Sequence, residues 1–479
     1  MSKNRRFKGF FNWIEFLSKP KRALVALMVC SFAIGVLTMP KVSYMGNVLG
    51  SRVPANVATN LDQTGQSMVV SGFEKVVTEK LKVTNESTRF FLLNLFLVVI
   101  HMVLAFVLFR ITSFYTNRTW MRIGFVAACL YGTYLWNYLR AHNGEALQVL
   151  LFSMSYLFFL QFKAAFMPSK KGAPLKNNAM KPLALAWLSI LCLILTKISY
   201  VVLAPIFAFA VLYLGHFHGE NFKKKTGQKF ALQSVIFPAI VMFAIACTLN
   251  YFQTGHAFNT GMTQIREGFH ALSNSVWVGL GGFFFSPQWS IFVHFPLLIL
   301  AIFGARTFYK KFKVEATYLA ATFVIFMVMM AKMPNWKGEY GYGPRYVIFF
   351  LPILALPALF VMEKLIQNRK DNLHKAALGF FALVMAASFW AQLQVNRLDF
   401  FAYYSIRPDM TQTKNADVRK YFTETNFAKI NWDFLQAKNN LDQLPVMRAL
   451  ASEMKPSAYR AYKTKVETVL ARGNYYWCN

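Results

Sequence analysis

The sequence predicts an all-α integral membrane protein with about eleven transmembrane helices. Of its 479 residues, 56% are hydrophobic and only 15% are charged, whereas soluble domains carry about a quarter charged residues. Apolar runs of about 20 residues, the length that crosses a bilayer, recur along the chain. Such runs satisfy their backbone hydrogen bonds in lipid only as helices, because open strands would leave amide groups unpaired.

The predicted spans are joined mostly by short connections. They cover residues 23–39, 90–109, 123–139, 146–166, 182–197, 200–216, 231–250, 291–305, 316–332, 346–362 and 376–393. The first connection, 40–89, is long, and apolar residues at helical spacing from Met68 to Leu81 predict an amphipathic helix on the membrane surface. Residues 394–479 show helical periodicity and follow the transmembrane domain 1–393 as a small helical region.

The charge distribution predicts how the chain is oriented. The first 22 residues carry seven Lys and Arg, and basic residues also dominate the loops at 163–181, 223–229, 306–313 and 364–375. The positive-inside rule therefore places the N-terminus and these loops in the cytoplasm. An odd number of spans then makes the loop 40–89 and the C-terminal region extracytoplasmic. The net charge of +32 forms no continuous basic face, so we expect no nucleic-acid partner.

One polar stretch, PNWKGEYGYGPRY from Pro334 to Tyr346, separates two apolar spans on the extracytoplasmic side. It carries Glu339, Tyr342 and Arg345 together with three glycines, which permit tight turns. A charged Arg345 at the mouth of a membrane helix is costly unless a polar or anionic group uses it. The alternative is an interfacial arginine that snorkels beside an aromatic belt.

Two acidic residues stand out on the same side. Asp62 precedes the amphipathic helix, where it either caps the helix or supplies a reactive carboxylate. Glu145 begins the fourth span, just after Arg140 and His142. This group is either a salt-bridged interfacial cluster or a site for a cation or a substrate hydroxyl.

Lys197 is a lone cation between the spans 182–197 and 200–216. It either snorkels to the interface or binds a phosphate as a point charge. Nucleotide-binding loops and the HExxH and GxSxG motifs are absent from the sequence. The sequence thus requires no cofactor. A divalent cation bound at the acidic positions is an alternative that the sequence leaves open.

Three segments resemble motifs of one family of membrane enzymes. The segments are Trp336 with Gly341-Tyr342-Gly343-Pro344-Arg345-Tyr346 and Leu351-Pro352, the run Gly281 to Pro287 with Phe295-Pro296-Leu297-Leu298, and Thr196-Lys197. They are similar to a Trp-Gly…Gly-Pro-Arg-Tyr…Leu-Pro motif, a Gly-Leu-Leu-Phe-Ser-Pro…Ser-Pro-Leu-Leu segment and a basic residue at an outer turn. Over most of residues 20–390 the chain resembles bacterial GT-C-type membrane glycosyltransferases, the group related to protein mannosyltransferases and lipid A aminoarabinose transferases.

The resemblance implies a GT-C-like bundle in a bacterial inner membrane and an inverting sugar transfer from a polyprenyl-phosphate donor. The acceptor would be an envelope glycan, lipid or protein. Asp62 occupies the place of the family's first-loop acid, which serves as catalytic base or metal ligand, although Gln63 replaces the second acid that a metal site would need. Lys197 and Arg345 would hold the lipid phosphate. The other candidate substrate-binding residues are Glu145, His142, Arg140, Glu339 and Tyr342.

Two other functions compete with sugar transfer. A transporter or flippase of an anionic lipid would need charges deep within the spans and often internal repeats, and the sequence displays neither convincingly. A non-catalytic membrane assembly protein on the same scaffold is favoured by the missing second acid beside Asp62. The transferase interpretation predicts that Asp62, Glu145, Lys197 and Arg345 meet at one extracytoplasmic cavity.

Overall fold

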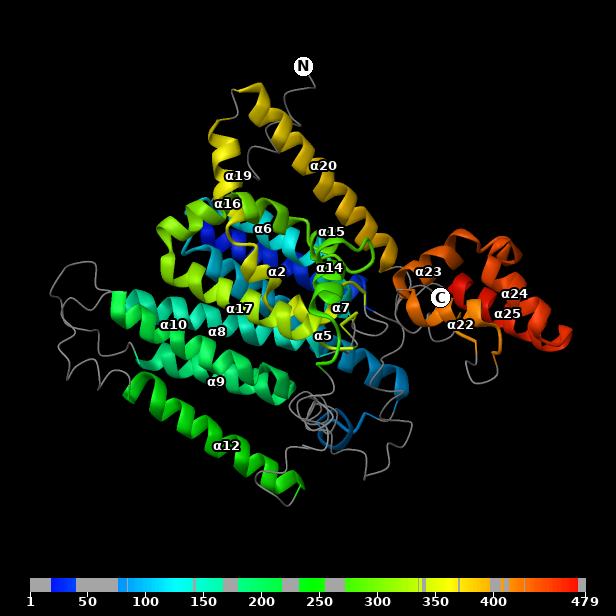
Figure 1. Ribbon diagram of the computed structural model, residues 1–479, viewed down its shortest axis with the longest axis horizontal. Helices are drawn as coiled ribbons and strands as arrows, with labels where there is room; N and C mark the ends of the chain where they lie inside the picture. Colours follow the sequence, from blue (N-terminus) through cyan, green and yellow to red (C-terminus); the bar gives the residue numbers. More distant parts are fainter. Residues whose placement is uncertain are drawn as a thin grey trace.

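The structure is a computed structural model that describes residues 19–39, 76–83, 85–140, 144–166, 180–217, 232–254, 272–334, 336–337, 342–368, 371–396, 406–408, 413–425 and 427–472. These residues form helices and no strand, which confirms the all-α class. Figure 1 shows a bundle of helices with a second group of helices, α22 to α25, at one end. The chain is a multi-pass membrane protein by the length and apolarity of its helices.

Five described helices are long and apolar enough to cross a membrane. They are α2 (Pro20–Leu37), α5 (Glu86–Thr112), α8 (Glu145–Phe166), α17 (Lys313–Ala331) and α20 (Asn372–Val395). A sixth span results if η6 (Arg345–Phe350) and α18 (Leu351–Leu354) are joined with α19 (Ala358–Gln367) across a bend of 43°. Shorter apolar helices are α9 (Met180–Thr196), α10 (Leu203–Phe217), α12 (Phe237–Thr254) and α14 (Val276–Phe285). Every expected span coincides with helical structure, but eleven full-length spans are not confirmed.

Besides the bent span 346–362, two further expected spans are broken. The span 123–139 divides into α6 (Thr119–Tyr131) and α7 (Leu135–Arg140). Thr133 lies in the break, where its Oγ1 donates to the carbonyl of Cys129 (2.6 Å) and accepts from the amide of Leu135 (3.2 Å). The span 291–305 divides into α15 (Ile291–His294) and α16 (Leu297–Lys311), because Pro296 starts a helix readily but cannot continue one.

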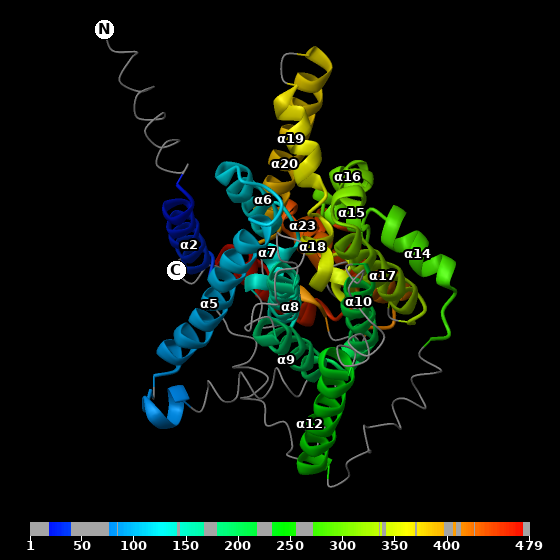
Figure 2. The same cartoon turned by 90° about the vertical axis from the view of Figure 1, so that its left-hand side faces the viewer.

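Helix α8 lies at the centre of the bundle, in contact with α5, α9 and η6. Its buried aromatic residues pack against rings from other helices, such as Tyr156 on Tyr318 with ring centroids 6.2 Å apart. Helices α12 and α20 differ, since both expose apolar side chains and project from opposite sides of the bundle (Figure 2). Such exposed apolar surface is expected of helices that face lipid.

Helix α14 was not among the predicted spans. Its ten residues cover about 15 Å, and Figure 1 shows it lying across the direction of α8 and α17. Glycines permit its close packing: a Cβ on Gly279 would come within 2.3 Å of the Ala331 carbonyl oxygen, and one on Gly282 within 1.9 Å of the Trp336 ring. The glycine-rich run therefore packs this helix onto the bundle.

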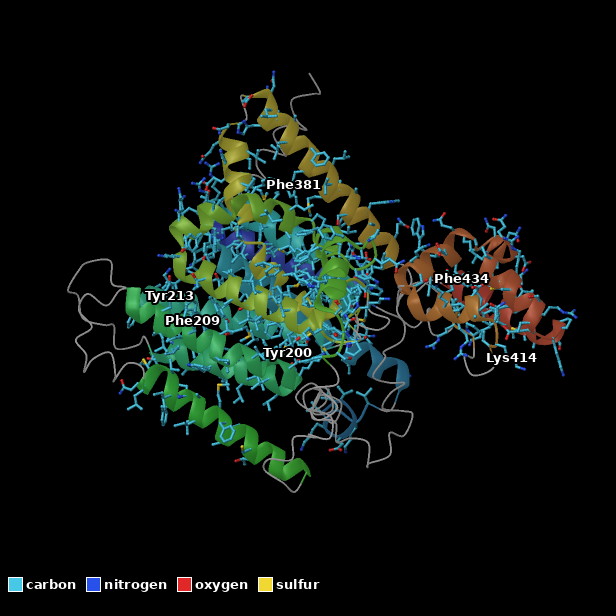
Figure 3. All side chains as sticks on the ribbon, viewed as in Figure 1. Tyr200, Phe209, Tyr213, Phe381, Lys414 and Phe434 are labelled. Atoms are coloured by element: carbon cyan, nitrogen blue, oxygen red, sulfur yellow. The ribbon has the colours of Figure 1, made fainter. Side chains whose placement is uncertain are left out.

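The C-terminal region contains α22 (Ala416–Glu424), α23 (Phe427–Gln436), α24 (Pro445–Glu453) and α25 (Pro456–Arg472). Phe434, which Figure 3 labels, is fully buried there together with Phe422 and Met447. Helix α23 contacts α20, so the region sits beside the end of α20. Its extracytoplasmic location stays a prediction. The amphipathic helix expected around 68–82 is described only at η2 (Val76–Lys80).

Candidate functional site

The candidate site lies where α8 begins, at Glu145. We call this end of the bundle the site end and the opposite end, where α8 finishes at Phe166, the far end. Glu145 is the first residue of α8, a position where the helix dipole favours a negative charge. Its side chain is only 6% exposed. A buried carboxylate of this kind requires a cation or several hydrogen bonds.

Arg345 supplies the cation. It is the first residue of η6, and its Nε donates a hydrogen bond to Oε1 of Glu145, 200 positions away in the sequence. The arginine side chain is 25% exposed, so the pair opens to the surroundings on the arginine side. Oε2 of Glu145 has no hydrogen-bond partner among the described residues. The pair therefore keeps an unused acceptor oxygen beside an accessible guanidinium.

Tyr138 of α7 and Tyr134, which directly precedes α7, hold the turn that presents Arg345. Tyr138 donates its hydroxyl to the carbonyl of Tyr342 and Tyr134 donates to the carbonyl of Pro344, both at 3.1 Å. Between these carbonyls Gly343 adopts a φ of +68°, which L-residues with a side chain rarely do. A Cβ on Gly343 would lie 2.9 Å from the Tyr134 ring. Glycine is thus required at this position by both conformation and space.

Lys197 lies in the same part of the bundle. It follows α9 at the start of the 3₁₀ turn η3 (Ile198–Val202), and its Nζ sits 4.1 Å from the centroid of the Tyr346 ring. Tyr346 directly follows Arg345, so both cations are associated with the start of η6. A cation over a tyrosine face is attracted by the ring electrons.

Arg140 is engaged differently from what the sequence suggested. Its Nε donates to the carbonyl of Thr38, and its Nη1 donates to the carbonyl (2.6 Å) and Oδ1 (2.9 Å) of Asn396. These bonds engage Nε and Nη1 of an arginine that is 6% exposed and join the ends of α2, α7 and α20. The described contacts of Arg140 are thus to backbone and amide groups of the protein, and the assignment to substrate binding stays a prediction.

Three other candidates, Asp62, His142 and Glu339, lie outside the described residues. Tyr342 is described and buried, and burial raises the pKa of its hydroxyl to about 12. The phenol therefore stays protonated at neutral pH. In the described part of the chain no group of three or more His, Cys, Asp or Glu is placed to hold a metal ion.

The sequence reasoning missed the residues that support the Glu145–Arg345 pair. Besides Tyr134 and Tyr138 these include Tyr200, labelled in Figure 3, which donates to Oε1 of Gln148 at 2.7 Å. They also include Gln392, which donates to the hydroxyl of Tyr342 at 3.1 Å. The available signal was polar side chains inside apolar runs, since a glutamine or tyrosine within a span normally faces a partner in the protein.

No protein-family model and no curated protein sequence matches the chain. Among solved structures, it is similar to the Archaeoglobus fulgidus oligosaccharyltransferase, a structure tethered to an acceptor peptide, with 11% identity and a TM-score of 0.45. That likeness covers 84% of this chain and 59% of the oligosaccharyltransferase, so the chain spans less than two thirds of that protein.

It is also similar to ArnT from Cupriavidus metallidurans bound to undecaprenyl phosphate, with 14% identity and a TM-score of 0.47 over 94% of this chain and 75% of ArnT.

Proposed function

We propose that this protein transfers a sugar from a polyprenyl-phosphate donor to an envelope acceptor at the outer face of the bacterial cytoplasmic membrane. The proposal is carried by one observation: a buried glutamate, paired with a half-buried arginine at one end of a membrane bundle, has an acceptor oxygen without a partner among the described residues. A purely structural ion pair is more stable when both carboxylate oxygens have partners, whereas a binding site leaves one oxygen for its ligand.

The cations are suited to the phosphate of a lipid-linked donor. A guanidinium has five N–H donors, and Glu145 uses only Nε of Arg345 in the described contacts. The remaining donors match a phosphate in a bidentate manner. Lys197, held on the ring of Tyr346, would add a second positive charge to the same anion. The polyprenyl tail would lie in lipid along the apolar helices, which explains why the sequence carries no nucleotide-binding motif.

The reaction would be a single displacement at the anomeric carbon of the sugar. The bond between this carbon and the phosphate oxygen breaks, and polyprenyl phosphate leaves with the electron pair. The acceptor hydroxyl oxygen forms the new bond from the opposite face, with inversion, and its proton passes to the carboxylate of Asp62. Arg345 and Lys197 stabilise the charge on the leaving phosphate. The role of Asp62 rests on the motif resemblance, and Oε2 of Glu145 would accept a hydrogen bond from the sugar.

The first test is a mass analysis of envelope glycans and lipid-linked sugars in a deletion strain. We expect one glycan to disappear and its polyprenyl-linked sugar to accumulate. The wild-type protein and the control Arg306→Ala, which removes an exposed arginine of α16, should restore the glycan. Arg345→Ala should not. An unchanged glycan and lipid-linked sugar profile in the deletion strain would contradict the proposal.

A second measurement separates a transferase from a flippase. The lipid-linked sugar accumulated by the deletion strain is extracted and mixed in detergent with purified protein and a heat-inactivated envelope extract of the deletion strain, which supplies the unmodified acceptor and no active enzyme. A transferase moves the sugar to its acceptor in micelles, because no bilayer has to be crossed. A flippase restores the glycan in cells but transfers no sugar in micelles, and that outcome would refute the enzymatic proposal.

A further inference from the structure

Helix α20 differs from the other described spans in how it is attached to the bundle. Its apolar side chains point mostly outward: Leu373 is 74% exposed, Phe380 70% and Leu383 68%. Its one buried residue is the polar Gln392, and the capping residue Asn396 is also buried. A helix held by apolar packing would show the reverse pattern, with hydrophobic residues buried. This helix is anchored by polar contacts near its C-terminal end.

These contacts form a line that we call the α20 polar seam, made of Ser388, Gln392 and Asn396. The three residues are four positions apart and therefore lie on one face of the helix. Ser388 donates to the carbonyl of Gly132 at 2.7 Å, and Asn396 accepts from Nη1 of Arg140 at 2.9 Å. The seam thus faces α6 and α7, both of which α20 contacts. In lipid, polar side chains on an inward face keep their hydrogen bonds to neighbouring helices, because the hydrocarbon offers no other partner.

The middle member of the seam reaches the turn before Arg345. Nε2 of Gln392 donates to the hydroxyl of Tyr342 at 3.1 Å. Tyr342 precedes the positive-φ Gly343, and its carbonyl accepts from Tyr138. Its ring stands edge-on to that of His294, with centroids 4.9 Å apart. Tyr342 is therefore held at its hydroxyl by α20, at its carbonyl by α7 and at its ring by α15.

We infer that Gln392 is a positioning residue for Arg345, acting through the hydroxyl of Tyr342. Packing of the Tyr342 ring does not require the hydroxyl, since a phenylalanine would pack as well. The bond to Gln392 adds direction, because it ties the turn to the α20 polar seam. The inference that this affects ligand binding rests on the proposed function, in which Arg345 holds the lipid phosphate.

The test compares undecaprenyl phosphate binding by the purified full-length protein and five variants, measured by native mass spectrometry. Gln392→Leu and Tyr342→Phe each remove the same hydrogen bond, and we expect each to weaken binding about 3- to 20-fold. The double variant should be no weaker than either single variant, because the two changes break one interaction. The control Gln367→Leu makes the same change at an exposed position at the end of α19 and should bind like the wild type.

Several outcomes would overturn the inference. Wild-type affinity in Gln392→Leu would do so, as would additive losses in the double variant. If Gln392→Leu only lowers the melting temperature and leaves the affinity of the folded protein unchanged, its role is in packing and not in positioning. Arg345→Ala serves as the reference: unchanged affinity in that variant would count against the proposed function instead.

A second readout does not depend on the function. Hydrogen–deuterium exchange of the segment 342–350 reports how firmly the turn is held. Gln392→Leu and Tyr342→Phe should both speed exchange in this segment, and Gln367→Leu should not. Unchanged exchange in Gln392→Leu would refute the positioning role even if the protein proves not to bind a lipid phosphate.

Discussion

Helix α8 carries an ion pair at each end, and the two pairs are built differently. At the site end Glu145 meets Arg345 through one oxygen and leaves Oε2 without a described partner. At the far end Nζ of Lys163 donates to both oxygens of Glu315, at 2.5 and 2.7 Å. Eighteen residues separate Glu145 from Lys163, about 27 Å along the helix, close to the thickness of the hydrocarbon layer.

The surroundings of the two pairs also differ. The far-end carboxylate is 2% exposed, and Phe312 lies 5.9 Å from Nζ of Lys163. Regular helices α8 and α17 carry both partners. The site-end arginine instead follows a positive-φ glycine and a tyrosine-held turn, and it is 25% exposed. A saturated pair between two helices stabilises the bundle, whereas an unsaturated pair on a turn can exchange partners with a ligand.

The largest effect is expected at the far end. Glu315→Ala leaves Lys163 buried without its carboxylate, which should lower the free energy of unfolding by about 3–5 kcal/mol. Replacing both residues, as Lys163→Met with Glu315→Leu, should restore most of that loss because no buried charge remains. Thermal unfolding in detergent measures both. Undecaprenyl phosphate affinity of the folded Glu315→Ala protein should equal that of the wild type, and a loss there would break the distinction between the two pairs.

Arg345→Ala should act on function. We expect sugar transfer to fall about 100- to 1,000-fold, the usual cost of removing one donor to a developing anion. The variant also leaves Glu145 unpaired, so stability falls too. Adding Glu145→Gln to Arg345→Ala removes the unpaired charge and should restore the melting temperature but not the transfer. Recovery of transfer in that double variant would show that the pair is structural, like the far-end pair.

Gly343→Ala tests whether the turn matters as much as the charges. A left-handed conformation costs an L-residue about 1–2 kcal/mol, and the added Cβ would also meet the rings of Tyr134 and His294 at 2.9 and 3.0 Å. We expect a lower melting temperature and weaker undecaprenyl phosphate binding. Gly124→Ala is the matched control, because a Cβ there meets nothing within 4 Å and alanine favours the helix. If the two variants have the same melting temperature and the same affinity for undecaprenyl phosphate, the turn is not part of the site.

An exposed pair in the C-terminal region should have the smallest effect. The Asp442 carboxylate accepts from Nζ of Lys463 and from the hydroxyl of Tyr459, and the hydrogen bond from Lys463 lowers the pKa of Asp442 most. A lowered folded-state pKa gives stability above the ordinary carboxyl pKa that is lost as the pH falls below about 4. The Asp442 side chain is 49% exposed, so the contribution is at most about 1 kcal/mol.

The check on this third pair is the melting temperature of the wild type and of Asp442→Asn between pH 3 and pH 6. The two proteins should differ slightly at pH 6 and converge as the pH approaches 3. A difference that grows toward acid pH would contradict the sign. A difference as large as that of Glu315→Ala would show that burial does not separate the three pairs.

The site could be predicted in part from single residues. A charge at the end of an apolar run is visible in the sequence, and this singled out Glu145, Lys197 and Arg345. The structure brings Glu145 and Arg345 into contact and sets Lys197 on the ring beside Arg345. The predicted meeting with Asp62 stays untested, because that residue lies outside the described ones. The partners of Arg140 were not foreseeable. An arginine that pairs with a nearby acid and one that binds distant carbonyl groups look the same in the sequence.

The sequence by itself determined the helical class, the approximate positions of the spans and the end of the bundle at which the polar residues gather. These properties depend on run length and local composition, which neighbouring residues set together. Only the tertiary structure decided that Glu145 pairs with Arg345, that α20 is held through Gln392, and that the span 123–139 breaks at Thr133. Those features depend on which helices become neighbours, and burial then forces each polar group to find its partner across the interface.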